Sequence, residues 1–135
     1  MANQIVVAGA VITGSAVLIA QRRHPPHLAG RWELPGGKVA PGETEPAALT
    51  RELAEELGVD TDAVEVGERL GVDVALDATT TLRAYRVRLA RGEPRPHDHH
   101  ALRWATADEL PAIDWVPADR AWLSELTRAL APAPP

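Results

Sequence analysis

The sequence contains no cysteine, which excludes disulfides, thiolate metal sites and a cysteine nucleophile. It also lacks a long apolar run: the longest, residues 5–12, is too short to span a bilayer, so we expect no membrane partner. No basic stretch precedes that run as in a secretory signal, which predicts a cytoplasmic protein. The net charge of −5 argues against a nucleic acid polymer as partner, because such binding normally needs a basic surface.

What is present is typical of one globular domain. The chain has 135 residues, of which 45% are hydrophobic and 24% charged. It shows no internal repeat and no interdomain linker. We therefore predict a single domain over residues 1–130 and a frayed, proline-rich tail over residues 131–135, while nothing in the sequence bears on the oligomeric state.

Periodicity predicts a mixed α/β fold. Runs of β-branched and apolar residues indicate strands at residues 5–13, 16–21, 32–34, 64–74, 79–89 and 102–104. Helical patterns cover residues 45–57 and 118–130, with a short helical turn at residues 106–110 and an irregular loop over residues 35–43. This order predicts a mixed sheet between helices.

The clearest helix follows the glycine-rich loop. Thr44 is a suitable N-cap and Gly58 a suitable C′ residue, which brackets the helix on both sides. Leu49, Leu53 and Leu57 recur at every fourth position. This stripe predicts one helix face that packs on the core.

Three carboxylates share another face of the same helix. Glu52, Glu55 and Glu56 stand at positions i, i+3 and i+4, where like charges cost about 0.2 to 0.5 kcal/mol per pair. A divalent cation would compensate this repulsion, and Mg²⁺ prefers carboxylate oxygens shared with water and phosphates. The alternative is an ordinary solvated, glutamate-rich surface.

The full spacing favours the metal. After Gly37 come five residues, Glu43, seven further residues and then Arg51-Glu-Leu-Ala-Glu-Glu-Leu-Gly-Val59. This segment matches every fixed position of the Nudix box, and the chain resembles the MutT-like Nudix hydrolases, specifically the CTP pyrophosphohydrolase branch. The resemblance implies an α/β/α sandwich with a mixed sheet. It also implies Mg²⁺-dependent hydrolysis of a nucleoside triphosphate to monophosphate and pyrophosphate, with Mn²⁺ as a substitute ion, in nucleotide-pool sanitation.

The resemblance carries roles onto individual residues. Glu52 and Glu56 correspond to metal ligands, Glu55 supports the same cluster, and the Gly37 carbonyl is a further ligand. Glu52 also corresponds to the residue that accepts a proton from water. Asp98 stands in a late loop where MutT-like proteins carry an additional acidic ligand, more often Glu.

Positive side chains near the box form a second group. Arg51 and Glu43 resemble the pair that orients the catalytic helix against its loop. Arg22, Arg23 and Lys38 are the expected phosphate contacts, and the alternative for these three is solvated surface charge. Lys38 is not the lysine of a P-loop, because the flanking positions lack the required glycine and hydroxyl residues.

The residue expected to contact the base is Asp119, just before the closing helix. Related oxidised-guanine enzymes carry Asn at this point, whereas the CTP pyrophosphohydrolase branch has Asp. An ionised Asp only accepts hydrogen bonds, so it favours an exocyclic amine such as that of cytosine. The sequence therefore predicts a CTP or dCTP pyrophosphatase, although Asp119 is equally suited to capping the last helix.

Other functions stay open beside this prediction. The first is an 8-oxo-dGTP diphosphatase, and Asp119 is the sequence feature that disfavours it. The second is a non-catalytic nucleotide-binding domain on the same fold, which the intact glutamates disfavour. An ADP-ribose pyrophosphatase is disfavoured, since no proline lies between Val59 and Pro94. A zinc site at residues 97–100 is also disfavoured, because three histidines and one aspartate without cysteine suit a polar loop better.

Overall fold

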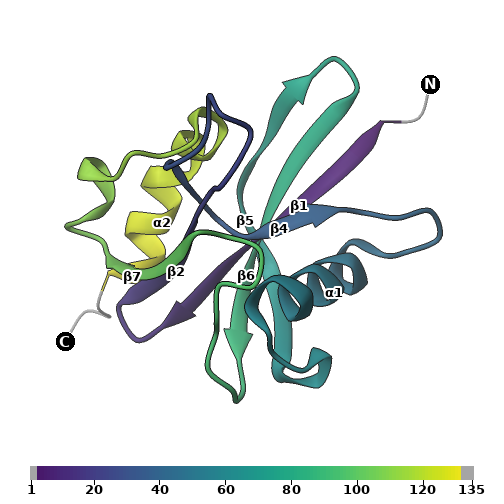
Figure 1. Cartoon of the computed structure of the whole chain (residues 1–135), viewed down its shortest axis with the longest axis horizontal. Coiled ribbons are helices and arrows are strands. Elements are labelled where there is room, and N and C mark those ends of the chain that lie inside the picture. The colour runs from purple at the N-terminus through teal and green to yellow at the C-terminus, as the bar shows by residue number, and fades with distance from the viewer. Residues whose placement is uncertain (1–2, 132–135) are drawn as a thin grey trace.

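The computed structural model describes residues 3–131, and it holds a seven-stranded mixed sheet between two helices (Figure 1). The strands are β1 (Gln4–Thr13), β2 (Ala16–Gln21), β3 (Trp32–Glu33), β4 (Gly36–Lys38), β5 (Val64–Asp77), β6 (Thr80–Leu89) and β7 (Ala101–Thr106). The helices are α1 (Glu45–Leu57) and α2 (Leu123–Leu130), with 3₁₀ turns η1 (Thr61–Ala63), η2 (Leu110–Ala112) and η3 (Pro117–Trp122). Residues 132–135 of the predicted tail lie outside the described residues. No helix within residues 3–131 is long and apolar enough to cross a membrane.

Strand β1 organises the sheet. It pairs in parallel with β6 from Gln4 to Val11, and antiparallel with β4 on its other side. Its last residues form a hairpin with β2, which also pairs with β3 and β7. β5 closes the far edge by antiparallel pairing with β6. The predicted mixed sheet is confirmed.

Alternation along β1 creates two separate cores, because successive side chains of a strand point to opposite faces. Val7 and Val11 join the core beneath α1, whereas Ala8 and Ala10 join the core beneath α2. Figure 1 shows the two helices on opposite sides of the sheet. The sandwich predicted from the sequence is confirmed.

Helix α1 begins and ends as its caps predict. The Thr44 hydroxyl accepts a hydrogen bond from the Ala47 N–H at 3.2 Å, and Gly58 adopts the left-handed conformation with φ of 66°. The leucine stripe at 49, 53 and 57 is fully buried. Gly9 of β1 lies beneath it, where a Cβ atom would be 3.0 Å from Leu53 Cδ1. This close packing fixes the position of α1 on the sheet.

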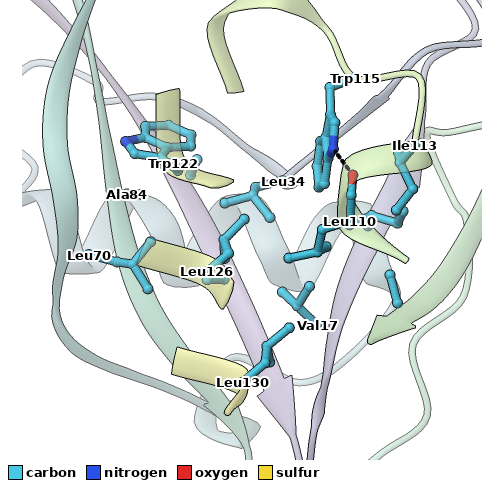
Figure 2. Packing of buried hydrophobic residues seen from close by; sticks show 14 of the residues in the cluster. Val17, Leu34, Leu70, Ala84, Leu110, Ile113, Trp115, Trp122, Leu126 and Leu130 are labelled. Atoms are coloured by element: carbon cyan, nitrogen blue, oxygen red, sulfur yellow. Dashed lines mark hydrogen bonds between the residues drawn. The ribbon is translucent and has the colours of Figure 1, made fainter. Parts of the chain in front are cut away.

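The core beneath α2 is built around two tryptophans (Figure 2). Trp115 and Trp122 are fully buried, and each indole N–H donates to a carbonyl, Leu110 O at 2.9 Å and Val72 O at 2.8 Å respectively. Of the other two tryptophans, Trp32 is half-buried and Trp104 lies exposed on β7.

Two local predictions differ from the structure. Residues 36–38, predicted as loop, form β4. The sequence does not predict this strand, because two of its three residues are glycines, which give no strand signal. A Cβ atom on Gly36 would lie 1.9 Å from Val7 O, so only glycine permits this pairing with β1. The closing helix starts as the 3₁₀ turn η3 with Pro117 in its first turn, and becomes α-helical only at Leu123. The helical turn predicted at residues 106–110 is confirmed, since the Glu109 and Leu110 N–H groups donate to the Thr106 and Ala107 carbonyls, and η2 follows directly.

The leucine stripe of α1 yields a stability prediction. Leu53→Ala removes a fully buried side chain and should lower the free energy of unfolding by about 2 to 5 kcal/mol in urea denaturation. Leu76→Ala is the matched control, since Leu76 is 45% exposed and the same substitution there should change stability by no more than about 0.5 kcal/mol. Equal losses in both variants would contradict the assigned core.

Candidate active site

Two adjoining hollows lie beside the loop that precedes α1. The larger, of about 720 Å³, is lined mainly by apolar residues of β1, the β5–β6 hairpin and the segment around η3, together with Gly36, Gly37, Lys38 and Asp119. The smaller, of about 170 Å³, is lined by charged and polar residues: Arg22, Arg23, His24, Glu33, Glu56, Asp98 and His99, with Gly36. Arg22, Glu33 and Gly36 line both hollows, so an elongated ligand can occupy the two together.

The glycine loop is in close contact with Glu52, the first of the three clustered glutamates of α1. A Cβ atom on Gly37 would lie 2.4 Å from the carboxylate carbon of Glu52. The Glu52 carboxylate therefore lies against the backbone of β4. Any residue larger than glycine at position 37 would displace it. The structure thus brings together two residues that the sequence predicts as metal ligands.

Arg51 ties this loop to the helix. Its Nε and Nη2 donate to the two carboxylate oxygens of Glu43 at 2.8 and 2.9 Å, and its Nη1 donates to Glu52 Oε1 at 2.8 Å. Nη2 also donates to Lys38 O at 3.2 Å. The Arg51 hydrogen bonds and the Ala40 N–H lower the pKa of Glu43 to about 2. Hydrogen bonds to Glu43 and Glu52 raise the pKa of Arg51, so this clamp is charged at every ordinary pH.

Glu56 is the buried member of the glutamate set. It is 6% exposed, and its Oε2 has no hydrogen-bond partner among the described residues. Burial raises its pKa to about 9, and the nearby carboxylates of Glu52, Glu33 and Asp98 add to that rise. A carboxylate in such surroundings requires a cation to be ionised. Glu55, by contrast, has a side chain that is 65% exposed, so the three glutamates do not converge equally.

These residues fit a hard divalent ion. Glu52 and Glu56 stand one helical turn apart, Asp98 lines the hollow that contains Glu56, and the unpartnered oxygen of Glu56 is the donor type that Mg²⁺ prefers. Within residues 3–131, no three acidic or histidine side chains form a ready-made metal cage. Such an open set suits an ion whose other ligands are water and substrate phosphates.

The three predicted phosphate contacts all border the hollows. Arg22 lines both and pairs with Glu33 at 2.8 Å, while its Nε donates to His24 O. Arg23 is exposed and lines the smaller hollow. Lys38 is exposed and lines the larger one. Two of the three cations are thus free of carboxylate partners within the described residues, and phosphate binding is compatible with their positions.

Asp119 lies in the larger hollow and does not cap a helix. It is 3% exposed, and its Oδ2 accepts a hydrogen bond from the Leu34 N–H at 2.7 Å. The N-cap of η3 is Val116, without a side-chain bond, so the capping alternative was wrong. Burial raises the pKa of Asp119 to about 8, against the opposing effect of the Leu34 hydrogen bond. The carboxyl group is therefore mostly neutral at pH 7, contrary to the ionised form assumed from the sequence.

Sequence reasoning missed Glu33 and His99. His99 is 5% exposed, and its Nε2 lies 2.8 Å from Glu33 Oε2, while its Nδ1 lies 3.7 Å from Glu56 Oε1. The run at residues 97–100 forms a loop, and His99 within it is buried. A single sequence holds no signal for this, because the pairing of β2 with β3 decides which side chain of β3 meets the loop.

Comparison with known proteins finds one family over most of the chain. A family model described as NUDIX domain matches residues 3–126. A Mycobacterium tuberculosis protein, provisionally named 8-oxo-dGTP diphosphatase 2, is 66% identical over 130 residues, 96% of this chain and 92% of that protein. The CTP pyrophosphohydrolase of Escherichia coli is 36% identical over 114 residues, 84% of each chain.

Solved structures share the fold over the whole chain. The solution structure of the E. coli ORF135 protein superposes with a TM-score of 0.78 at 32% identity, covering 99% of this chain and 96% of that one. The similarity therefore extends from the sequence motif to the arrangement of the whole sheet and both helices.

The contact between Gly37 and Glu52 yields a prediction for the site. Gly37→Ala should displace the flexible end of Glu52 rather than backbone, so we expect a fall in kcat of about 100-fold with little change in thermal stability. Gly67→Ala is the control, because Gly67 lies on β5 and a Cβ atom there meets nothing closer than Arg86 O at 3.3 Å. Steady-state pyrophosphate release and a melting curve check both; full activity in Gly37→Ala would refute the assigned contact.

Proposed function

This chain belongs to the Nudix family, and from that premise we propose that it is a Mg²⁺-dependent nucleoside triphosphate pyrophosphohydrolase whose preferred substrate is 8-oxo-dGTP. It would convert the triphosphate and water into the monophosphate and pyrophosphate. The observation that carries the proposal is the buried carboxylate of Glu56, whose Oε2 has no hydrogen-bond partner among the described residues. It lies in a small hollow that shares lining residues with the larger hollow of about 720 Å³, which Asp119 also lines.

The lining of the larger hollow supports a nucleotide as ligand. Apolar residues such as Leu82 and Val116 suit the flat faces of a base, and Asp119 is the buried polar group available to its edge. The same hollow includes Gly36, Gly37 and Lys38 of the catalytic loop. A nucleotide seated here places its phosphates beside the carboxylates of α1.

Each candidate residue has a task in this reaction. Glu52, Glu56, Asp98 and the Gly37 carbonyl would hold the divalent ion, which when bound neutralises phosphate charge and lowers the pKa of a water. Glu52 would accept the proton of the attacking water, since Arg51 and the Gly37 backbone keep its carboxylate in place. Glu55 is assigned a supporting charge at the exposed side of the cluster.

The remaining side chains bind rather than react. Arg22, Arg23 and Lys38 would contact phosphate oxygens, because all three border the hollows. Arg51 and Glu43 keep the helix and its loop in register through their paired hydrogen bonds.

The neutral form of Asp119 supports oxidised guanine as the base. A protonated carboxyl group offers one O–H donor and one carbonyl acceptor, as an asparagine amide does. The guanine O6 accepts hydrogen bonds, and oxidation at C8 places a hydrogen on the neighbouring N7, so O6 and N7–H match this donor and acceptor. Unoxidised guanine presents two acceptors there and leaves the Asp119 carbonyl without a donor from the base.

The relatives support the same substrate, and CTP becomes the second candidate. The M. tuberculosis relative, with the higher identity, carries the 8-oxo-dGTP name, whereas the E. coli CTP pyrophosphohydrolase is less similar. The observation that favours CTP is Asp119 in its ionised form, which accepts from the cytosine amine. That form prevails only above about pH 8.

A nucleotide panel tests the proposed reaction. With Mg²⁺ at pH 7, kcat/KM for 8-oxo-dGTP should exceed that for dGTP, CTP and dCTP by about ten- to hundredfold, as expected from one unmatched buried polar group. Glu52→Gln should lower pyrophosphate release by at least about 100-fold. A preference for CTP would overturn the substrate, equal rates in Glu52→Gln would remove Glu52 from catalysis, and no turnover of any nucleotide would favour a binding domain.

The protonation of Asp119 gives a pH prediction. Its pKa of about 8 means that between pH 7 and pH 9 the neutral fraction falls about tenfold and the ionised fraction rises about tenfold. Because 8-oxo-dGTP requires the neutral form and CTP the ionised form, kcat/KM for 8-oxo-dGTP relative to CTP should fall by about 100-fold. Asp119→Asn keeps a donor and an acceptor without titrating, and should make this ratio nearly independent of pH. A ratio that falls equally in wild type and Asp119→Asn would show that another group, or the base itself, is responsible.

A further inference from the structure

A row of polar contacts joins the larger hollow to the buried carboxylate of α1. Arg22 Nη1 donates to Glu33 Oε1 at 2.8 Å, and Glu33 Oε2 lies 2.8 Å from His99 Nε2. The other ring nitrogen, His99 Nδ1, lies 3.7 Å from Glu56 Oε1. The imidazole ring thus stands between two carboxylates from different elements.

The end of His99 that faces Glu33 is fixed. Both carboxylate oxygens of Glu33 are engaged, one by Arg22 and one by His99, so Glu33 can neither rotate nor approach α1 without losing a bond. Because a carboxylate is an acceptor, the hydrogen in this contact belongs to His99 Nε2. The hydrogen bond to the Glu33 carboxylate therefore fixes the orientation of the His99 ring, as carboxylates do for histidines in metal sites.

The ring nitrogen of His99 that faces Glu56 has no hydrogen-bond partner among the described residues. Within residues 3–131, the buried side-chain atoms that have no hydrogen-bond partner are Glu56 Oε2 and His99 Nδ1. Nδ1 and Glu56 Oε1 are separated by slightly more than a hydrogen bond, so a small movement of the Glu56 carboxylate would join them. In that contact the ring is an imidazolium, which donates from Nε2–H to Glu33 and from Nδ1–H to Glu56. The same movement would settle the direction in which Oε2 points.

We propose that His99 is a positioning residue for Glu56: anchored by Glu33, its ring holds one carboxylate oxygen so that the other faces the divalent ion. This inference rests on the proposed function, in which Glu56 is a ligand of that ion. Glu33 lines both hollows and His99 lines only the smaller one. His99 should therefore affect the ion without touching the base.

The test is the binding of Mn²⁺ alone, followed by the electron paramagnetic resonance of the free ion. Gln places a polar group near the former Nε2 and Asn near the former Nδ1, so each substitution keeps one of the two contacts. Because both contacts are needed, His99→Gln and His99→Asn should each raise the Kd for Mn²⁺ by about tenfold or more. His100→Gln is the matched control, since His100 is exposed and lines a different hollow, and its Kd should not change.

A kinetic measurement separates positioning from folding. In the His99 variants the Mg²⁺ concentration for half-maximal rate should rise by a similar factor, while KM for 8-oxo-dGTP at saturating Mg²⁺ stays within about twofold of wild type. Glu33→Gln keeps the shape of the anchor and removes its charge, so it should weaken Mn²⁺ binding in the same direction even where a His99 variant fails to fold.

The outcomes are distinct. Unchanged Mn²⁺ affinity in folded His99 variants overturns the positioning role and leaves the proposed function intact. Wild-type protein that binds no Mn²⁺ overturns the metal assignment of Glu56 and, with it, this inference. A lower melting temperature with an unchanged Kd would reduce His99 to a structural residue.

Discussion

The carboxylate of Glu56 is buried in a hollow that contains the carboxylates of Glu33 and Asp98 and lies close to Glu52, and this concentration of negative charge constrains the whole site. Isolated burial of a charge is costly, so it persists only where a partner is available. Arg51 forms ion pairs with Glu43 and Glu52, and Arg22 forms an ion pair with Glu33. Glu56 has no arginine or lysine partner among the described residues, and under the proposed function a divalent cation supplies the missing positive charge.

Close backbone packing positions the carboxylates of this site. In β4, Gly36 lies against the backbone of β1 and Gly37 lies against the Glu52 carboxylate. Both approaches are so close that a Cβ atom at either position would overlap its neighbour. The leucine stripe of α1, packed over Gly9, fixes the rotation of the helix, so Glu52 and Glu56 point toward the loop while Glu55 points to solvent. Core packing on one helix face thus determines the chemistry of the other.

The parts of the site predictable from the sequence are those encoded locally. The Thr44 and Gly58 caps, the leucine stripe and the pairing of Arg51 with Glu43 all lie within one segment of the chain, and a motif captures them together. β4 escaped prediction because strand propensity resides in side chains that glycine lacks. Glu33 and His99 escaped because their meeting depends on the register of β2 with β3 and on a loop 66 residues further along.

Asp119 shows why residue identity alone does not determine which base the site prefers. Read as a sequence letter it is an acceptor, and an acceptor favours cytosine. In the structure, burial among η3, β1 and the backbone after β3 raises its pKa to about 8, and the neutral acid then has the donor and acceptor of an amide. Asp and Asn become chemically alike in this hollow near neutral pH. Under the proposed function, the base preference therefore depends on the burial of the carboxyl group, which is set by the packing of segments distant in the sequence, as much as on the residue at position 119.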